Sequence, residues 1–185
     1  GEVLIGGKPY EVTRIGDNAF NSYPNKSNDV RQLKVSENIT NIGENAMRSF
    51  SSVQRIWLPK SLTTISSKAF DGCNSISYVF SNMDSPSVLS DDIFSIPEIN
   101  TATLFVPSTT GYTSAVLGRF SNVVVGDYVA DKEDGGMTYV CYKVKKAPAE
   151  GEDVTYTRSA ILTKASTSIK EAPINGIIKA KATTT

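Results

Sequence analysis

One pattern occurs twice in succession, as ITNIGENAMRSFSSVQRIWLPKS (residues 39–61) and as LTTISSKAFDGCNSISYVFSN (residues 62–82). The matching apolar positions, each pair separated by 23 residues, are Ile39/Leu62, Ile42/Ile65, Met47/Phe70, Phe50/Cys73, Val53/Ile76 and Ile56/Val79. A unit of this size cannot bury its own apolar face, so consecutive copies stack and share one core. The repeat therefore predicts a solenoid.

The spacing within a copy indicates its local structure. Ile56 and Leu58 alternate with other residues at the period of a β-strand, and Pro59 ends the strand because it has no N–H to donate. Residues 46–50 have a helix-like spacing and are expected to form a helical turn. A period of about 20–29 residues is typical of leucine-rich repeats. We therefore expect an α/β leucine-rich-repeat solenoid with short parallel strands and helical turns.

Two further copies flank this central pair. A first copy begins at Val12 and fits only with an insertion in the Pro/Asn/Ser-rich loop at residues 24–29. A degenerate fourth copy uses residues 93–94 and the strand positions at 104–106. Residues 108–119 then have the pattern of a helix that closes the end of the core.

The C-terminal third of the chain does not match the repeat. Residues 131–136, DKEDGG, are expected to form a polar turn near the domain boundary. Strands are expected at residues 137–144, 154–163 and 174–182. The chain is thus divided into a capped solenoid (residues 1–126) and a small antiparallel β module (residues 127–185).

Composition excludes several classes of function. The 19 basic and 19 acidic side chains cancel, which argues against a nucleic-acid partner. No apolar run approaches the roughly 18 residues that a membrane-spanning helix needs. The chain has no histidine, so Ser-His and Cys-His nucleophiles are absent. We expect no enzyme activity and no cofactor.

Metal binding and disulfide formation are also not favoured. An acidic cluster comprises Asp127, Asp131, Glu133 and Asp134. It lacks the ligand order of a calcium loop, because Gly135 occupies a position that needs a carboxylate, and we interpret it as a solvated linker, with calcium binding as the alternative. Cys73 occupies an apolar repeat position and Cys141 lies outside the repeat, so both are expected to be reduced thiols.

Three motifs connect the chain to a known family: AFDGC (residues 69–73), LPKSLTTI (58–65) and TLFVPSTTGYTSA (103–115). Over residues 10–125 the chain resembles BspA-type leucine-rich-repeat proteins, which are surface or secreted proteins of host-associated bacteria and some protists. The resemblance implies a cell-surface or secreted protein, and a few family members are adhesins. Because the chain opens on Gly1 in mid-pattern, we expect that a signal peptide has been removed. The chain departs from the family in having only about three and a half copies, and in Met47, where phenylalanine is usual.

The strand register predicts a row of aromatic residues. Side chains alternate on a strand, so the residues beside Ile56 point away from the core. The copies then place one outward row at Lys34, Trp57, Phe80 and Phe105, with Arg55 and Tyr78 beside it. Exposed aromatic patches of this kind are unusual on a monomer.

Three interpretations of this row stay open. In the leading one, the open sheet face binds a protein or glycan ligand on a host or bacterial surface, and the chain is a non-catalytic recognition or adhesion module. In the alternative, residues 127–185 cover the row and the chain is a structural spacer. In the third, the row joins two copies in a self-associating dimer. The chain is accordingly expected to be either a monomer or a weak dimer.

Overall fold

The computed structural model describes residues 2–23, 29–84, 89, 92–94, 98–134, 137–145 and 155–165. The chain divides into two compact units, Gly1–Val124 and Val125–Thr185. This division lies two residues before the domain boundary that the sequence suggested. No helix in the described part of the chain is long and apolar enough to cross a membrane.

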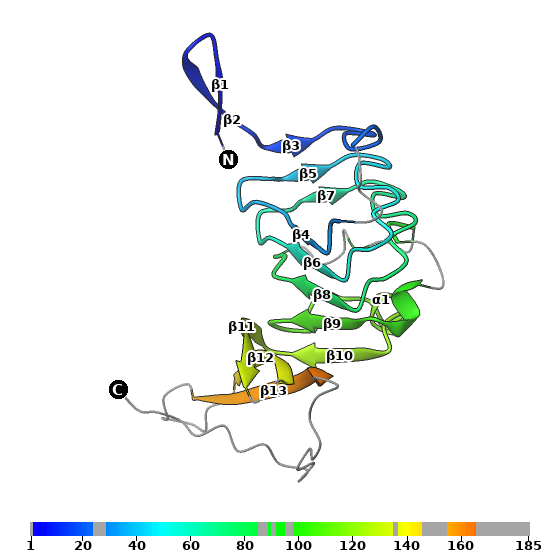
Figure 1. Ribbon diagram of the computed structural model, residues 1–185, viewed down its shortest axis with the longest axis vertical. Coiled ribbons are helices and arrows are strands. Elements are labelled where there is room, and N and C mark those ends of the chain that lie inside the picture. The colour runs from blue at the N-terminus through cyan, green and yellow to red at the C-terminus, as the bar shows by residue number, and fades with distance from the viewer. Residues whose placement is uncertain are drawn as a thin grey trace. The chain divides into compact units, whose positions relative to one another are not determined.

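The first unit is a β-solenoid with two sheets, and its first three turns each supply a strand to both (Figure 1). One sheet has the order β3 (Arg14–Ile15), β5 (Asn41–Ile42) and β7 (Thr64–Ile65). The other has the order β4 (Gln32–Lys34), β6 (Arg55–Leu58), β8 (Tyr78–Ser81), β9 (Thr103–Val106) and β10 (Asn122–Val125). We call this second sheet the long sheet.

The predicted register of the long sheet is confirmed. Leu33 pairs with Ile56, Ile56 with Val79, and Val79 with Leu104, all in parallel. Ile56, Val79 and Leu104 are each 0% exposed. Each turn therefore places an equivalent apolar side chain in one continuous core, as the repeat requires.

The expected helical turn at residues 46–50 is wrong, because these residues form hydrogen-bonded turns without helix. Asn45 (φ 51°) and Ser49 (φ 63°) adopt left-handed conformations, which a right-handed helix does not tolerate. Amides here donate to the next turn of the solenoid: Asn45 N to Ser67 O (3.4 Å), Met47 N to Ala69 O (2.8 Å) and Ser49 N to Asp71 O (2.7 Å). The segment thus forms a ladder between turns, where a helix would satisfy its amides internally.

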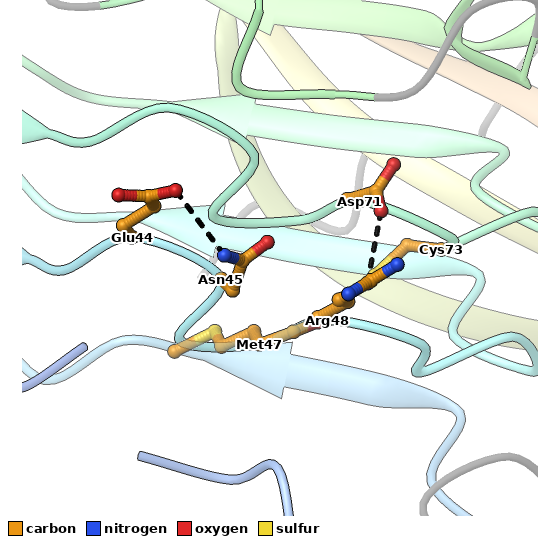
Figure 2. Close-up of polar contacts among 6 residues, drawn as sticks. All are labelled: Glu44, Asn45, Met47, Arg48, Asp71 and Cys73. Carbon is orange, nitrogen blue, oxygen red and sulfur yellow. Dashed lines mark hydrogen bonds and ion pairs between the residues drawn. The ribbon is translucent and has the colours of Figure 1, made fainter. Parts of the chain in front are cut away.

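Side chains reinforce this ladder (Figure 2). Arg48 Nε lies 3.0 Å from Asp71 Oδ2, and both side chains are partly exposed. The Cys73 thiol is 1% exposed and donates to the carbonyl of Met47 at 3.3 Å. Because the donor and acceptor belong to adjacent turns in both contacts, each contact holds the stack together.

The C-terminal end of the solenoid is closed by short elements. A 3-10 turn, η2 (Glu98–Thr101), precedes β9, and α1 (Ser114–Leu117) follows it. Thr113 caps α1, since its hydroxyl accepts a hydrogen bond from the amide of Val116 at 3.2 Å. The helix expected over residues 108–119 is therefore a single turn.

A hairpin precedes the solenoid. It consists of β1 (Glu2–Ile5) and β2 (Lys8–Glu11), which pair only with each other among the described strands. Gly6 (φ 59°) and Gly7 (φ 77°) form the turn, where two consecutive positive φ angles favour glycine.

The second unit is an antiparallel sheet of β11 (Asp127–Asp134), β12 (Met137–Lys145) and β13 (Tyr156–Ala165) in that order. The turn expected at residues 131–136 is wrong at its beginning, because residues 131–134 pair with β12 in the sheet. The strand expected at residues 174–182 lies outside the described residues.

Candidate functional site

The outward row predicted from the repeat is present on the long sheet. Lys34 pairs with Trp57, Trp57 with Phe80, and Phe80 with Phe105. The ring centroids of Trp57 and Phe80 lie 4.9 Å apart with planes at 14°, and those of Phe80 and Phe105 lie 4.9 Å apart at 24°. The rings stack because parallel strands repeat at about 4.8 Å, which is close to the stacking distance.

Arg55 and Tyr78 flank this row on the same face. The Arg55 guanidinium carbon lies 5.8 Å from the centre of the Tyr78 ring, within the range of a cation–π contact. The Tyr78 ring lies 6.3 Å from Phe80 and 6.2 Å from Phe105, between centroids. All six residues singled out from the sequence therefore lie on one face of one sheet.

The row differs in exposure from one end to the other. Lys34 is exposed and Trp57 is partly exposed, whereas Phe80 and Phe105 are each only 2% exposed. The expectation of three exposed aromatic rings is thus wrong for two of them. Phe80 stacks between Trp57 and Phe105, and neither phenylalanine belongs to the solenoid core cluster.

The accessible part of this face includes the exposed Lys34 and the partly exposed Arg55, Trp57 and Tyr78. We call these four residues the outer-face patch. They combine two aromatic rings with two cationic side chains. The strand pairing places them in two rows, Gln32–Arg55–Tyr78–Thr103 and Lys34–Trp57–Phe80–Phe105, and neither row contains an acidic residue. The patch therefore offers flat apolar contact together with positive charge.

A partly buried hydrogen bond joins Ser81, at the end of β8, to Tyr112, which precedes α1. The sequence analysis did not identify this pair. The hydroxyls of Ser81 and Tyr112 lie 2.7 Å apart. Burial raises the pKa of the Tyr112 phenol, and the hydrogen bond with Ser81 acts in the opposite direction. We assign this pair to stability, because Ser81 is 0% exposed and a buried hydroxyl needs a partner.

The other candidate groups form no site. Within the described ranges, no three potential metal ligands of the His, Cys, Asp or Glu type lie together. The acidic segment that begins at Asp127 is part of β11. Cys73 and Cys141 are both free thiols, and Cys73 is buried.

Comparisons with known proteins agree with the repeat. Residues 8–114 match a family model described as "BspA type Leucine rich repeat region (6 copies)". A crystal structure of a leucine-rich cell surface protein from Faecalibacterium prausnitzii A2-165 is similar with 14% identity and a TM-score of 0.34. The match covers 75% of this chain and 49% of that one, so this chain spans about half of its length.

No curated protein matches the chain. The likeness to the crystal structure is too weak to carry an argument about function. The family model is decisive, because it spans more than half of the 185 residues and covers the stacked turns described above. The chain belongs to the family of BspA type leucine-rich-repeat proteins.

Proposed function

We propose that the chain is a non-catalytic recognition module of a cell-surface or secreted protein, and that it binds a protein or glycan through the outer-face patch. The observation that supports this most is Trp57. Its ring is partly exposed at the accessible end of a stacked aromatic row, between the cationic side chains of neighbouring positions.

The chemistry of the patch suits recognition. Tryptophan, tyrosine and arginine are the residues that most often dominate the free energy of protein interfaces. A flat indole also stacks on the apolar face of a sugar ring. The patch lies on short strands whose neighbours fix them, so little conformational entropy is lost on binding.

The location outside the cell is supported by family membership. This observation concerns relatives, and for this chain the location is part of the proposal. The non-catalytic character of the module is likewise part of the proposal. It is supported by family membership and by a candidate site that consists of stacked aromatic rings on a sheet face.

A second candidate function is a structural spacer. The 2% exposure of Phe80 and of Phe105 favours it, because buried rings contribute to packing and have no surface to offer a ligand. In this alternative, residues 127–185 cover the aromatic row. The two candidates differ in what Trp57 does: it contacts a ligand in the first and packs internally in the second.

Replacing Trp57 by alanine separates the two functions. We expect Trp57→Ala to weaken binding to a host matrix protein or glycan by more than about 2 kcal/mol, as hot-spot aromatics do, with little change in the melting curve. Tyr156→Ala is the matched control, because Tyr156 is an aromatic residue of the second unit that is 50% exposed. A large loss of thermal stability in Trp57→Ala, with no binding partner among the matrix proteins and glycans tested, would favour the spacer.

A further inference from the structure

The first turn of the solenoid is open. Its inward residues Ile15 and Leu33 are partly exposed, whereas their partners in the next turn, Ile42 and Ile56, are 1% and 0% exposed. An apolar opening of about 430 Å³ lies at this end. Its floor is formed by core residues of the stack and its walls by the first turn, as the lining set Val12, Ile15, Tyr23, Leu33, Met47 and Phe50 illustrates.

Both sheets of the solenoid also end at this opening. β3 is the terminal strand of one sheet and β4 of the other, and both belong to the first turn. A terminal strand presents unpaired backbone groups and favours contact with another chain. The same end therefore combines a hollow apolar surface with two sheet edges.

The hairpin β1–β2 carries a matching apolar surface. The pair register places Val3 opposite Tyr10 and Ile5 opposite Lys8, so these side chains share one face. Val3, Ile5 and Tyr10 are 45%, 61% and 50% exposed. An isolated two-stranded hairpin has marginal stability in water, so this face gains from being covered.

The opposite face of the hairpin is less suited to burial. Glu2 lies directly opposite Glu11, and Leu4 lies opposite Pro9. Burying two adjacent carboxylates is costly. The face with Val3, Ile5 and Tyr10 carries one charged residue, Lys8, whose long side chain can keep its ammonium group in water. We therefore identify this face as the one that docks.

The hairpin is poorly placed to close its own opening. Only Val12 and Thr13 separate β2 from β3, and the carbonyl of Thr13 accepts hydrogen bonds from the amide (2.8 Å) and the hydroxyl (3.2 Å) of Thr40. The link is thus held by the next turn of the solenoid. Figure 1 shows the hairpin extending beyond β3, away from β5.

We propose that this end of the solenoid is a self-association surface, and that its occupant is the hairpin of a second copy of this chain. The face with Val3, Ile5 and Tyr10 of one copy packs into the first-turn opening of the other. A two-fold axis makes the reverse contact at the same time, so the assembly closes as a dimer. This surface shares Lys34 with the outer-face patch, because Lys34 also lines the opening, but it contains none of the aromatic residues of the patch and does not depend on the proposed function.

Sedimentation of the full chain over a concentration series tests the proposal. The wild-type mass rises from 19.9 kDa toward twice that value as concentration increases. Ile5→Asp weakens the dimer by at least about tenfold, because it places a charge on the docking face. Leu4→Asp is the matched control. Leu4 is adjacent to Ile5 in the sequence and is 74% exposed, but its side chain lies on the other face of the hairpin, so the dimer persists.

A variant of the receiving surface completes the test. Tyr23 lines the opening and is 49% exposed, so Tyr23→Ser weakens the dimer while the melting curve shows that the chain still folds. Mixing Ile5→Asp with Tyr23→Ser recovers part of the association, because one of the two contacts in the mixed dimer joins an intact hairpin to an intact opening. Three results would overturn the proposal: a wild-type monomer at every concentration, equal effects of Ile5→Asp and Leu4→Asp, or no recovery on mixing. A monomer that Ile5→Asp destabilises would place the hairpin on its own chain.

Discussion

Replacing Ile56 by alanine tests the packing of the solenoid. Ile56 lies in β6, an inner strand of the long sheet, is 0% exposed and pairs with Leu33 and Val79 in the neighbouring turns. The substitution removes about three carbon groups, worth about 0.8 kcal/mol each, or about 2.4 kcal/mol in transfer free energy. The cavity left between rigid turns adds to this, so the free energy of unfolding should fall by about 2–5 kcal/mol.

The loss should follow the side chain's size and its face. Ile56→Val should cost about 0.5–1.5 kcal/mol, since it removes one carbon. Lys34→Ala, on the exposed outward row, should change the free energy of unfolding by less than about 0.5 kcal/mol. Urea unfolding can be followed by the fluorescence of Trp57, the one tryptophan of the chain, which reports on the solenoid unit. Equal losses for Ile56→Ala and Lys34→Ala would refute the register, because a slip by one residue exchanges the faces of a strand.

Three further predictions concern local features. Gly72→Ala should destabilise the solenoid by about 1–2 kcal/mol, because Gly72 has φ +71° and its added Cβ would lie 3.3 Å from a neighbouring hydroxyl, whereas Gly16→Ala, with nothing within 4 Å, should not. Burial raises the pKa of Tyr112 above that of an exposed tyrosine, so the folded state holds this proton more tightly; its stabilising contribution is complete below the pKa of the unfolded chain and is lost as pH rises through the folded pKa. Thermal melting at increasing alkaline pH should therefore show a smaller loss of stability in Tyr112→Phe than in wild type. Thiol titration of the unfolded, unreduced chain should find both Cys73 and Cys141 free, and finding neither free would contradict the structure.

The sequence was most informative about the strand pairing of the long sheet, which the stacking of the repeats determines. The 23-residue offset and the alternation around Ile56 predicted which residues pair across the long sheet, because stacking requires equivalent side chains to meet. The same argument placed Trp57 and Phe80 in one row. Strand alternation states which face a residue occupies, but the exposure of Phe80 also depends on what packs over that face, which the alternation does not encode.

The failed predictions share a different cause. Asn45 and Ser49 have apolar neighbours at helix-like spacing, yet their left-handed conformations allow backbone bonds to the next turn. Those bonds become available only after the turns stack. Likewise, Asp127–Asp134 has the composition of a loop, and its pairing with β12 makes it a strand. Local propensity was overridden by long-range hydrogen bonding in both cases.

Quenching of Trp57 fluorescence by acrylamide tests the central claim most directly, because recognition through the outer-face patch requires this ring to be open to a partner. The measurement compares the native and the unfolded chain and needs no known ligand. Since Trp57 is partly exposed, the account predicts quenching in the native chain that is weaker than in the unfolded chain but well above that of a buried tryptophan. A Trp57 signal that stays unquenched until the chain unfolds would contradict the account and assign the aromatic row to internal packing.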